Sequence, residues 1–298
     1  MPLRLRLGCF FISCALVPLF ALDSAPANPA PPPPGFGATA VPSTAEAQGL
    51  AAASLRYTSP DWVPTWSDDF ETPGRPDPAK WTYEHGLVRN GEAQFYTRDR
   101  AENARVADGH LIITARKDPW EKSSYTSASL TTLDRFSFTC GKLEIRARVP
   151  KGRGTWPALW TLGANQNGPG WPACGEIDLM EYVGMIPDRL HFTVHTRAFN
   201  HTKGTQKGSN FTLAEPWKEF HRYGLIWTPE RLEWFFDGQL VFSFANTGKG
   251  PDEWPFDSPQ YLLMNLAIGG GWGGQKGIDD ALFPAEFRID YVRVWQRP

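Results

Sequence analysis

Three carboxylates stand within six residues, at Glu176, Asp178 and Glu181, in a stretch whose other residues are apolar. Side chains alternate faces along a β-strand, so Glu176 and Asp178 point to one side while Glu181 would point to the other. A β-bulge around Leu179 and Met180 would return Glu181 to the face of the first two. Like charges on one face raise each other's pKa and are costly unless they have a task. Two such carboxylates can cleave a glycosidic bond: one attacks the anomeric carbon and the other, protonated, donates to the leaving oxygen.

A solvated edge strand is the alternative interpretation, because charged residues are common on exposed strand faces. Two segments upstream argue against it: residues 154–160 read G-T-W-P-A-L-W, and residues 170–174 read G-W-P-A-C. With these segments the chain resembles glycoside hydrolase family 16, specifically its laminarinase-like endo-β-1,3-glucanases, whose pattern runs W-P-A-x-W and then G-E-I-D-x-M-E. Lichenases and xyloglucan transferases of the same family resemble the shorter form E-I-D-x-E, which has no bulge.

The resemblance implies a role for each acid. Glu176 corresponds to the nucleophile and Glu181 to the general acid/base, while Asp178 would hydrogen-bond the nucleophile and tune its charge. The two glutamates must hold opposite protonation states, and repulsion across a closed cleft separates their pKa values. The family retains configuration, which requires carboxyl groups about 5–5.5 Å apart. It also has a histidine beside the acid/base, which would be His195 here; without the resemblance, a histidine on an ordinary polar strand face is an equally good interpretation.

A cleft for sugars needs flat apolar walls together with polar groups for hydroxyls. The chain has 13 tryptophans, most of which a β-sandwich would place in its core, so position in a motif decides which of them face a ligand. The residues expected to contact substrate, besides His195, are Trp156, Trp160, Trp171, Asn90, Glu92, Arg135, Asn265 and Trp272.

Four of these depend on their surroundings. Residues 90–96 resemble the family's N-x-E-x-Q-x-Y segment, which lines the glycone side; Glu92 would accept from a sugar hydroxyl, with Arg135 as its partner. Asn265 matches a family asparagine but could equally cap sheet backbone. Trp272 lies among five glycines in residues 269–274, which favours a loop-borne platform over a buried anchor in a flexible loop.

The N-terminal residues predict export. A short basic segment precedes an apolar run from Leu7 to Leu22 that is too short and interrupted for a comfortable membrane span. We therefore expect a signal peptide over residues 1–25 and a secreted or periplasmic protein; an uncleaved signal anchor is the alternative. Residues 26–55 are rich in proline and alanine, which favours a disordered linker.

Residues 56–298 have the length of one large domain, and no helical period is sustained in them. Strands are expected where apolar and polar residues alternate, or where β-formers cluster: residues 142–149, 190–196, 260–268 and 287–295, and a hairpin of 232–236 and 240–244 around Asp237-Gly238. Many short strands predict an all-β, two-sheet sandwich. The resemblance specifies a β-jelly roll with a concave substrate cleft.

Charge and cysteines exclude some partners. The net charge is −2, so there is no basic field for nucleic acid or anionic lipid. Cys9 and Cys14 would leave with the signal peptide, and the spacing of Cys140 and Cys174 fits no zinc pattern. Whether those two form a disulfide or stay free thiols is open at this stage.

The resemblance implies no cofactor for catalysis and allows one structural calcium, with Asp290, the Gly109 carbonyl and Glu71 as its ligands. The expected function is therefore that of a monomeric endo-β-1,3-glucanase acting on β-glucan. The alternatives are a mixed-linkage glucan or galactan hydrolase, a transglycosylase of the same fold, and a glucan-recognition protein without catalysis.

Overall fold

The computed structural model describes residues 44–298. The expected signal peptide (1–25), the first part of the expected linker (26–43), Cys9 and Cys14 lie outside this range. Neither α-helix within residues 44–298 has the length and apolar character that a bilayer span needs.

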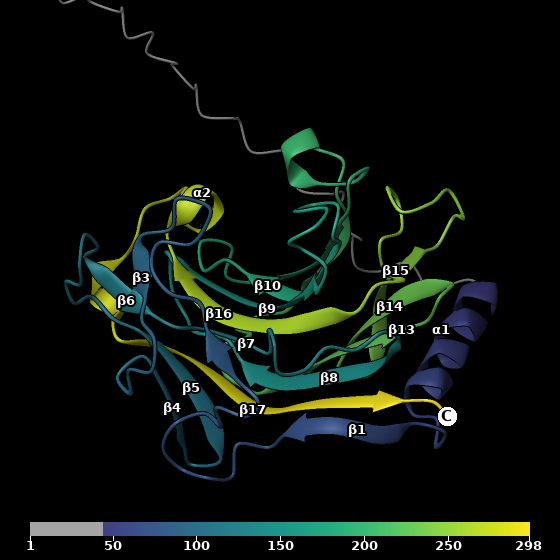
Figure 1. Ribbon diagram of the computed structural model, residues 1–298, viewed down its shortest axis with the longest axis horizontal. Helices are drawn as coiled ribbons and strands as arrows, with labels where there is room; N and C mark the ends of the chain where they lie inside the picture. The colour runs from purple at the N-terminus through teal and green to yellow at the C-terminus, as the bar shows by residue number, and fades with distance from the viewer. Residues whose placement is uncertain (1–43) are drawn as a thin grey trace, which may run out of the picture.

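Two curved sheets form a sandwich (Figure 1). The first sheet contains, in spatial order, β15 (Gln239–Ala245), β14 (Arg231–Phe236), β13 (His221–Trp227), β8 (Gly141–Arg148), β17 (Ala285–Gln296), β5 (His110–Ala115) and β4 (Ala104–Ala107), with β1 (Val63–Asp68) paired to β17. The second contains β12 (Lys207–Thr212), β11 (Arg189–His195), β10 (Glu176–Tyr182), β9 (Thr155–Gly163), β16 (Gln260–Ile268), β7 (Ser129–Thr131) and β2 (Thr82–Tyr83). The pairs within both sheets are antiparallel, as the predicted jelly roll requires.

Shorter elements complete the described chain. They are β3 (Gln94–Tyr96), which pairs in parallel with β6 (Tyr125–Ser127), α1 (Thr44–Tyr57), α2 (Gly270–Gly273), and the 3-10 turns η1 (His201–Lys203) and η2 (Asp280–Leu282). The predicted strands appear as β8, β11, β16 and β17, and the hairpin as β14–β15. Asp237 and Gly238 have φ of 48° and 85°, the left-handed conformation that a two-residue hairpin turn requires.

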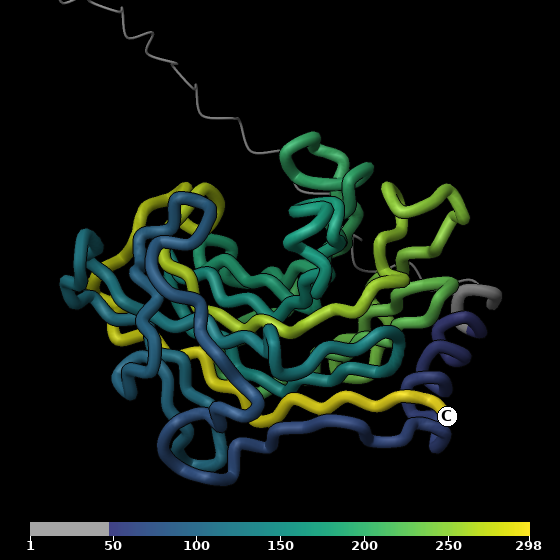
Figure 2. The backbone as a smooth tube through the Cα atoms, in the orientation of Figure 1, coloured from purple at the N-terminus to yellow at the C-terminus, as the bar shows by residue number. Residues whose placement is uncertain are grey.

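The core lies between the sheets, because strand alternation sends one set of side chains inward from each. Leu143 and Ile145 of β8 and Leu225 of β13 meet Ile177 and Leu179 of β10 in a single apolar cluster. The second sheet is curved and its outer face is concave, as the tube trace shows (Figure 2). That face carries the cleft described below.

The expected disordered linker is wrong over residues 44–55, where the chain forms the first part of α1. Ala53 and Tyr57 are spaced i, i+4 and share one helix face, which packs on Ile226 and Phe235 at the outer surface of the first sheet. The Tyr57 ring stacks on Phe235 with centroids 4.4 Å apart. Alanine and leucine are good helix formers. A segment rich in them that is too short to form a core of its own can therefore still form a helix whose apolar face packs on an existing sheet.

Polar contacts fix the register of α1 on this surface. Arg56 donates to both oxygens of the buried Glu233, at 2.5 and 3.1 Å, and the Tyr57 hydroxyl donates to Glu144. Gly224 makes room for the ring of Tyr57, because a Cβ at that position would collide with it. The C-terminal residues lie beside α1 (Figure 2), where the Arg297 guanidinium sits 4.6 Å from the Trp62 ring.

Removing residues 1–57 should therefore destabilise the domain. Loss of the Tyr57 and Ala53 packing, and of the hydrogen bonds that Arg56 and Tyr57 donate to Glu233 and Glu144, should cost about 3 kcal/mol of unfolding free energy, or about 6–12 °C in Tm for a domain of this size. Removing residues 1–43 is the matched control and should leave Tm unchanged. Equal Tm values for the two truncations, measured by calorimetry, would show that α1 contributes nothing.

Candidate active site

The bulge that the acid spacing predicts is present in β10. Opposite β11, Glu176 pairs with His195 and Asp178 with Thr193, but the next pair is Glu181 with His191. Three residues along β10 are therefore matched by two along β11, which is the register change of a bulge. All three carboxylates face the cleft, while Leu179 and Met180 between them are buried in the core.

The bulge is supported from the other sheet. The indole of Trp234 on β14 donates to the backbone oxygen of Asp178 at 2.9 Å. Trp234 is fully buried, so this bond satisfies both an indole N–H and a carbonyl that water does not reach. The strand that carries the acids is thus fixed by core packing and by a hydrogen bond between sheets.

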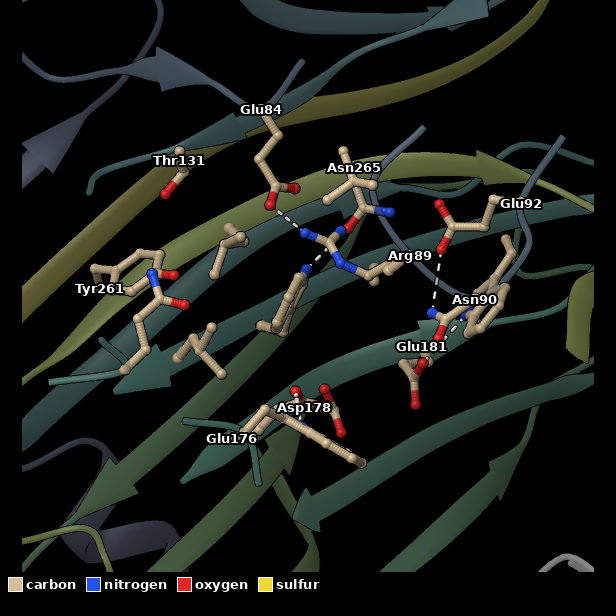
Figure 3. A pocket seen from close by; sticks show the side chains of 18 of the residues that line it. Glu84, Arg89, Asn90, Glu92, Thr131, Glu176, Asp178, Glu181, Tyr261 and Asn265 are labelled. Carbon is tan, nitrogen blue, oxygen red and sulfur yellow. Dashed lines mark hydrogen bonds and ion pairs between the residues drawn. The ribbon is translucent and has the colours of Figure 1, made fainter. Parts of the chain in front are cut away.

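The cleft over β10, β9 and β16 has a volume of ≈ 430 Å³, within the range of small-molecule and oligosaccharide sites. Its lining residues include both tryptophan-bearing segments, the 90–92 segment and the three acids (Figure 3). Of the residues expected to contact substrate, Trp156, Trp160, Trp171, Asn90, Glu92 and Asn265 line it. Arg135, Trp272 and His195 are not among its lining residues.

Glu176 and Glu181 each accept a hydrogen bond from a tryptophan. Trp171 Nε1 donates to Glu176 Oε2 at 2.8 Å, and Trp156 Nε1 donates to Glu181 Oε1 at 3.1 Å. The two motif tryptophans therefore act on the carboxylates themselves as well as on the cleft wall.

Burial and neighbouring charges raise the pKa values of Glu176 and Glu181 to different extents. Burial, and then the charge of Asp178, raise the pKa of Glu176 to about 7, while His195 and the Trp171 hydrogen bond oppose that rise. Burial and the charge of Asp178 raise the pKa of Glu181 well above its ordinary range. Burial also raises the pKa of Asp178, to about 8. Near neutral pH, Glu176 is the more readily ionised glutamate and Glu181 holds its proton.

His195 lies beside Glu176 and Asp178. Its Nε2 is 3.7 Å from Glu176 Oε1 and 3.4 Å from Asp178 Oδ2. His195 also acts on the expected acid/base, because its charge opposes the rise in the pKa of Glu181. Across the bulge, His191 is the residue of β11 that pairs with Glu181. Burial and the charge of Arg189 lower the pKa of His191 to about 4, so this histidine is neutral.

The 90–96 segment and Asn265 form one buried hydrogen-bond network. Glu92 accepts from Asn90 at 3.1 Å, Gln94 at 2.7 Å and Tyr96 at 3.1 Å. Asn265 Nδ2 donates to the Tyr96 hydroxyl at 3.0 Å, and the Asn265 side-chain oxygen accepts from Trp160 at 2.8 Å. Asn265 thus bonds side chains and does not cap sheet backbone, and Glu92 is oriented by three donors before any sugar arrives.

Arg135 is not the partner of Glu92. It is exposed and donates to the backbone oxygens of Pro78 and Asp134. The cleft's arginine is Arg89, which pairs with Glu84 and lies 4.9 Å over the Trp160 ring. Sequence reasoning missed it although it directly precedes Asn90, the first residue of the recognised segment.

Trp272 supports Trp156 from α2. The two rings meet edge to face with centroids 5.6 Å apart, and Trp272 meets His191 in the same way at 4.8 Å. Gly273 allows this approach, since a Cβ there would lie 3.0 Å from that of Trp156. The glycine-rich loop therefore positions Trp156, the tryptophan that donates to Glu181, and Trp272 itself is half-buried.

The structure bears on metals and cysteines as well. Cys140 and Cys174 are free thiols. Asp290, an expected calcium ligand, is engaged by the Arg146 guanidinium and lies 4.0 Å from His110, so a cation would compete with Arg146 there. One group of potential metal ligands does occur within residues 44–298, formed by Glu176, Asp178 and His195.

Comparisons with known proteins agree with this geometry. The model of Glycosyl hydrolases family 16 matches residues 91–293. A beta-glucanase of Rhodothermus marinus is 50% identical over 248 residues, which cover 80% of this chain and 86% of that protein. The X-ray structure of the laminarinase from Rhodothermus marinus superposes with a TM-score of 0.77 at 48% identity, over 80% of this chain and 98% of that one. SCLam, a non-specific endo-beta-1,3(4)-glucanase from the same family, has a TM-score of 0.77 at 44% identity, over 80% and 92% of the two chains.

Proposed function

This chain belongs to glycoside hydrolase family 16, and from that premise we propose that it is an endo-acting β-1,3-glucanase that cleaves laminarin-like β-glucan with retention of configuration. The observation that carries the proposal is the bulged strand, which presents Glu176 and Glu181 to one cleft with their pKa values raised to different extents.

The reaction follows as a double displacement. Glu181 gives its proton to the glycosidic oxygen while ionised Glu176 attacks the anomeric carbon; the glycosidic bond breaks and an ester bond to Glu176 forms. Glu181, now ionised, takes a proton from water, whose oxygen attacks the same carbon and releases Glu176. His195 and Asp178 act as positioning residues for Glu176, since they lie beside it.

Several alternatives share this site. Mixed-linkage glucan, a galactan, or transfer to a sugar in place of water would use the same acids, whereas a recognition protein would need neither. Incubation with laminarin, barley β-glucan and agarose, with products followed by NMR, tests the proposal. The proposal is supported if the oligosaccharides released from laminarin are first seen as β-anomers. Initial α-anomers, or no release from laminarin, would contradict it.

Trp171→Phe should move the acidic limb of the pH–rate profile to higher pH. The limb of kcat/KM reports ionisation of Glu176, and the indole hydrogen bond favours the ionised form. Losing a bond worth about 1.4 kcal/mol raises that pKa by about one unit. Trp254→Phe is the control, because Trp254 donates to Asp257 at 3.2 Å and does not line the cleft. If the acidic limb of Trp171→Phe stays at the wild-type pH, the indole hydrogen bond does not lower the pKa of Glu176.

Three expectations beyond the cleft complete the proposal. We propose export directed by residues 1–25, which N-terminal sequencing of the secreted protein would test. We also propose a monomer, to be tested by light scattering. A structural calcium at Asp290 is tested by adding calcium to EDTA-treated protein: a rise in Tm that Asp290→Asn abolishes would support it.

A further inference from the structure

We propose that Glu176, Asp178 and His195 form a binding site for one zinc ion, or a similar late transition-metal ion, and that its occupation reversibly blocks the cleft. The binding stands on geometry alone, whereas the blocking rests on the proposed function of Glu176.

The spacing of the ligand atoms suits a tetrahedral ion. Zinc binds nitrogen and oxygen at about 2.0–2.2 Å, which places neighbouring tetrahedral ligands about 3.3–3.6 Å apart. His195 Nε2 lies 3.4 Å from Asp178 Oδ2 and 3.7 Å from Glu176 Oε1. One ligand atom from each of the three residues lies within 4.8 Å of the others. Adjustments of a fraction of an ångström to about one ångström would complete three of four ligand positions.

The atoms that would bind the ion are free to do so. Trp171 occupies Oε2 of Glu176 and leaves Oε1 available on the side of His195. Asp178 Oδ2 has no hydrogen-bond partner among residues 44–298, although the Asp178 side chain is only 4% exposed. Buried polar atoms in proteins nearly always have a partner, and a cation between the three groups would provide one for this oxygen.

The donor set narrows the class of metal. An imidazole ligand favours zinc, copper, iron or nickel over magnesium and calcium. Calcium takes six to eight oxygen ligands, which this site does not offer. Glu176 and Asp178 also line the cleft, so the fourth position is open to water or to a glucan hydroxyl. An ion there would hold Glu176 Oε1 and prevent its attack on the anomeric carbon.

Direct binding tests the site. The full chain, freed of metal with EDTA, should bind one zinc ion in calorimetric titration with zinc chloride. His195→Gln and Asp178→Asn should each weaken binding at least tenfold, since even partners of metal ligands contribute about 10–100-fold to affinity. His221→Gln is the matched control and should bind within twofold of wild type, because His221 pairs with Asp237 on the first sheet at 2.8 Å.

Cobalt gives an independent readout. Wild-type protein loaded with cobalt(II) should show the intense visible absorption of a four-coordinate ion, and His195→Gln should lose it. Melting curves establish whether each variant folds. If one of the two ligand variants does not fold, the other is sufficient to test the site. Absence of stoichiometric zinc binding, or binding that both ligand variants retain, would overturn the proposal.

Kinetics then test the blocking. With laminarin, zinc should raise KM, leave kcat unchanged, and lose its effect on addition of EDTA. Zinc that binds at these ligands without competing with laminarin would confirm the metal site and overturn the blocking. If wild-type protein does not hydrolyse laminarin at all, the proposed function fails while the calorimetric and cobalt results still decide the metal site.

Discussion

Glu176→Gln should fold as the wild type does and lose turnover of laminarin. The amide has nearly the shape of the carboxylate and can still accept from Trp171, but it cannot attack the anomeric carbon. We expect kcat to fall by about 10⁴ or more, because no other group replaces a covalent nucleophile. The rate of reducing-sugar release, with circular dichroism to establish folding, measures this.

Asp134→Asn is a suitable control for charge removal, since Asp134 is exposed and does not line the cleft. It should retain the wild-type rate. The expected fall leaves a residual rate far below one per cent. A Glu176→Gln protein that keeps more than a few per cent of the normal rate, a threshold far above that residual rate, would therefore show that Glu176 is not the nucleophile.

Glu181→Ala should separate the two steps of the reaction. The alcohol that leaves from laminarin is a poor leaving group. Loss of the proton donor should therefore lower the rate of the first step by a factor of about 10²–10⁴. With an activated aryl glycoside the leaving group needs no proton, so the first step survives. The second step still lacks its base, so a glycosyl-enzyme should accumulate on Glu176 and appear as a burst.

Azide distinguishes the glutamates by stereochemistry. It needs no deprotonation, so it should restore turnover of Glu181→Ala and yield a β-glycosyl azide. Glu176→Ala should instead yield an α-azide, because azide enters from the face that the missing carboxylate leaves open. The same anomer from both variants, or normal laminarin hydrolysis by Glu181→Ala, would show that the roles are wrongly assigned.

Local rules were sufficient for the strands that they predicted, which are β8, β10, β11, β14, β15, β16 and β17, and for the bulge. Alternation predicted β8 and β11, and β16 has the predicted bounds. The bulge followed from the demand that Glu181 share a face with Asp178, a demand that involves only neighbouring residues.

The errors arose where a side chain's partner comes from elsewhere in the sequence. His191 was not singled out as the neighbour of Glu181 because strand pairing across a bulge cannot be counted from one strand alone. Arg135 was placed in the cleft by its chain position, whereas Arg89 is the arginine that the fold brings there. The helix α1 was missed because its stability depends on Phe235 and Gly224, which lie far along the chain.

The position of α1 also separates the stability of this enzyme from its chemistry. The helix packs on the outer surface of the first sheet beside β13, β14 and β15, at one end of the sandwich, while the cleft opens on the outer surface of the second sheet (Figure 1). None of the residues that line the cleft belongs to α1. Substitutions in the helix can therefore raise or lower the melting temperature of the domain while every group that contacts substrate stays in place.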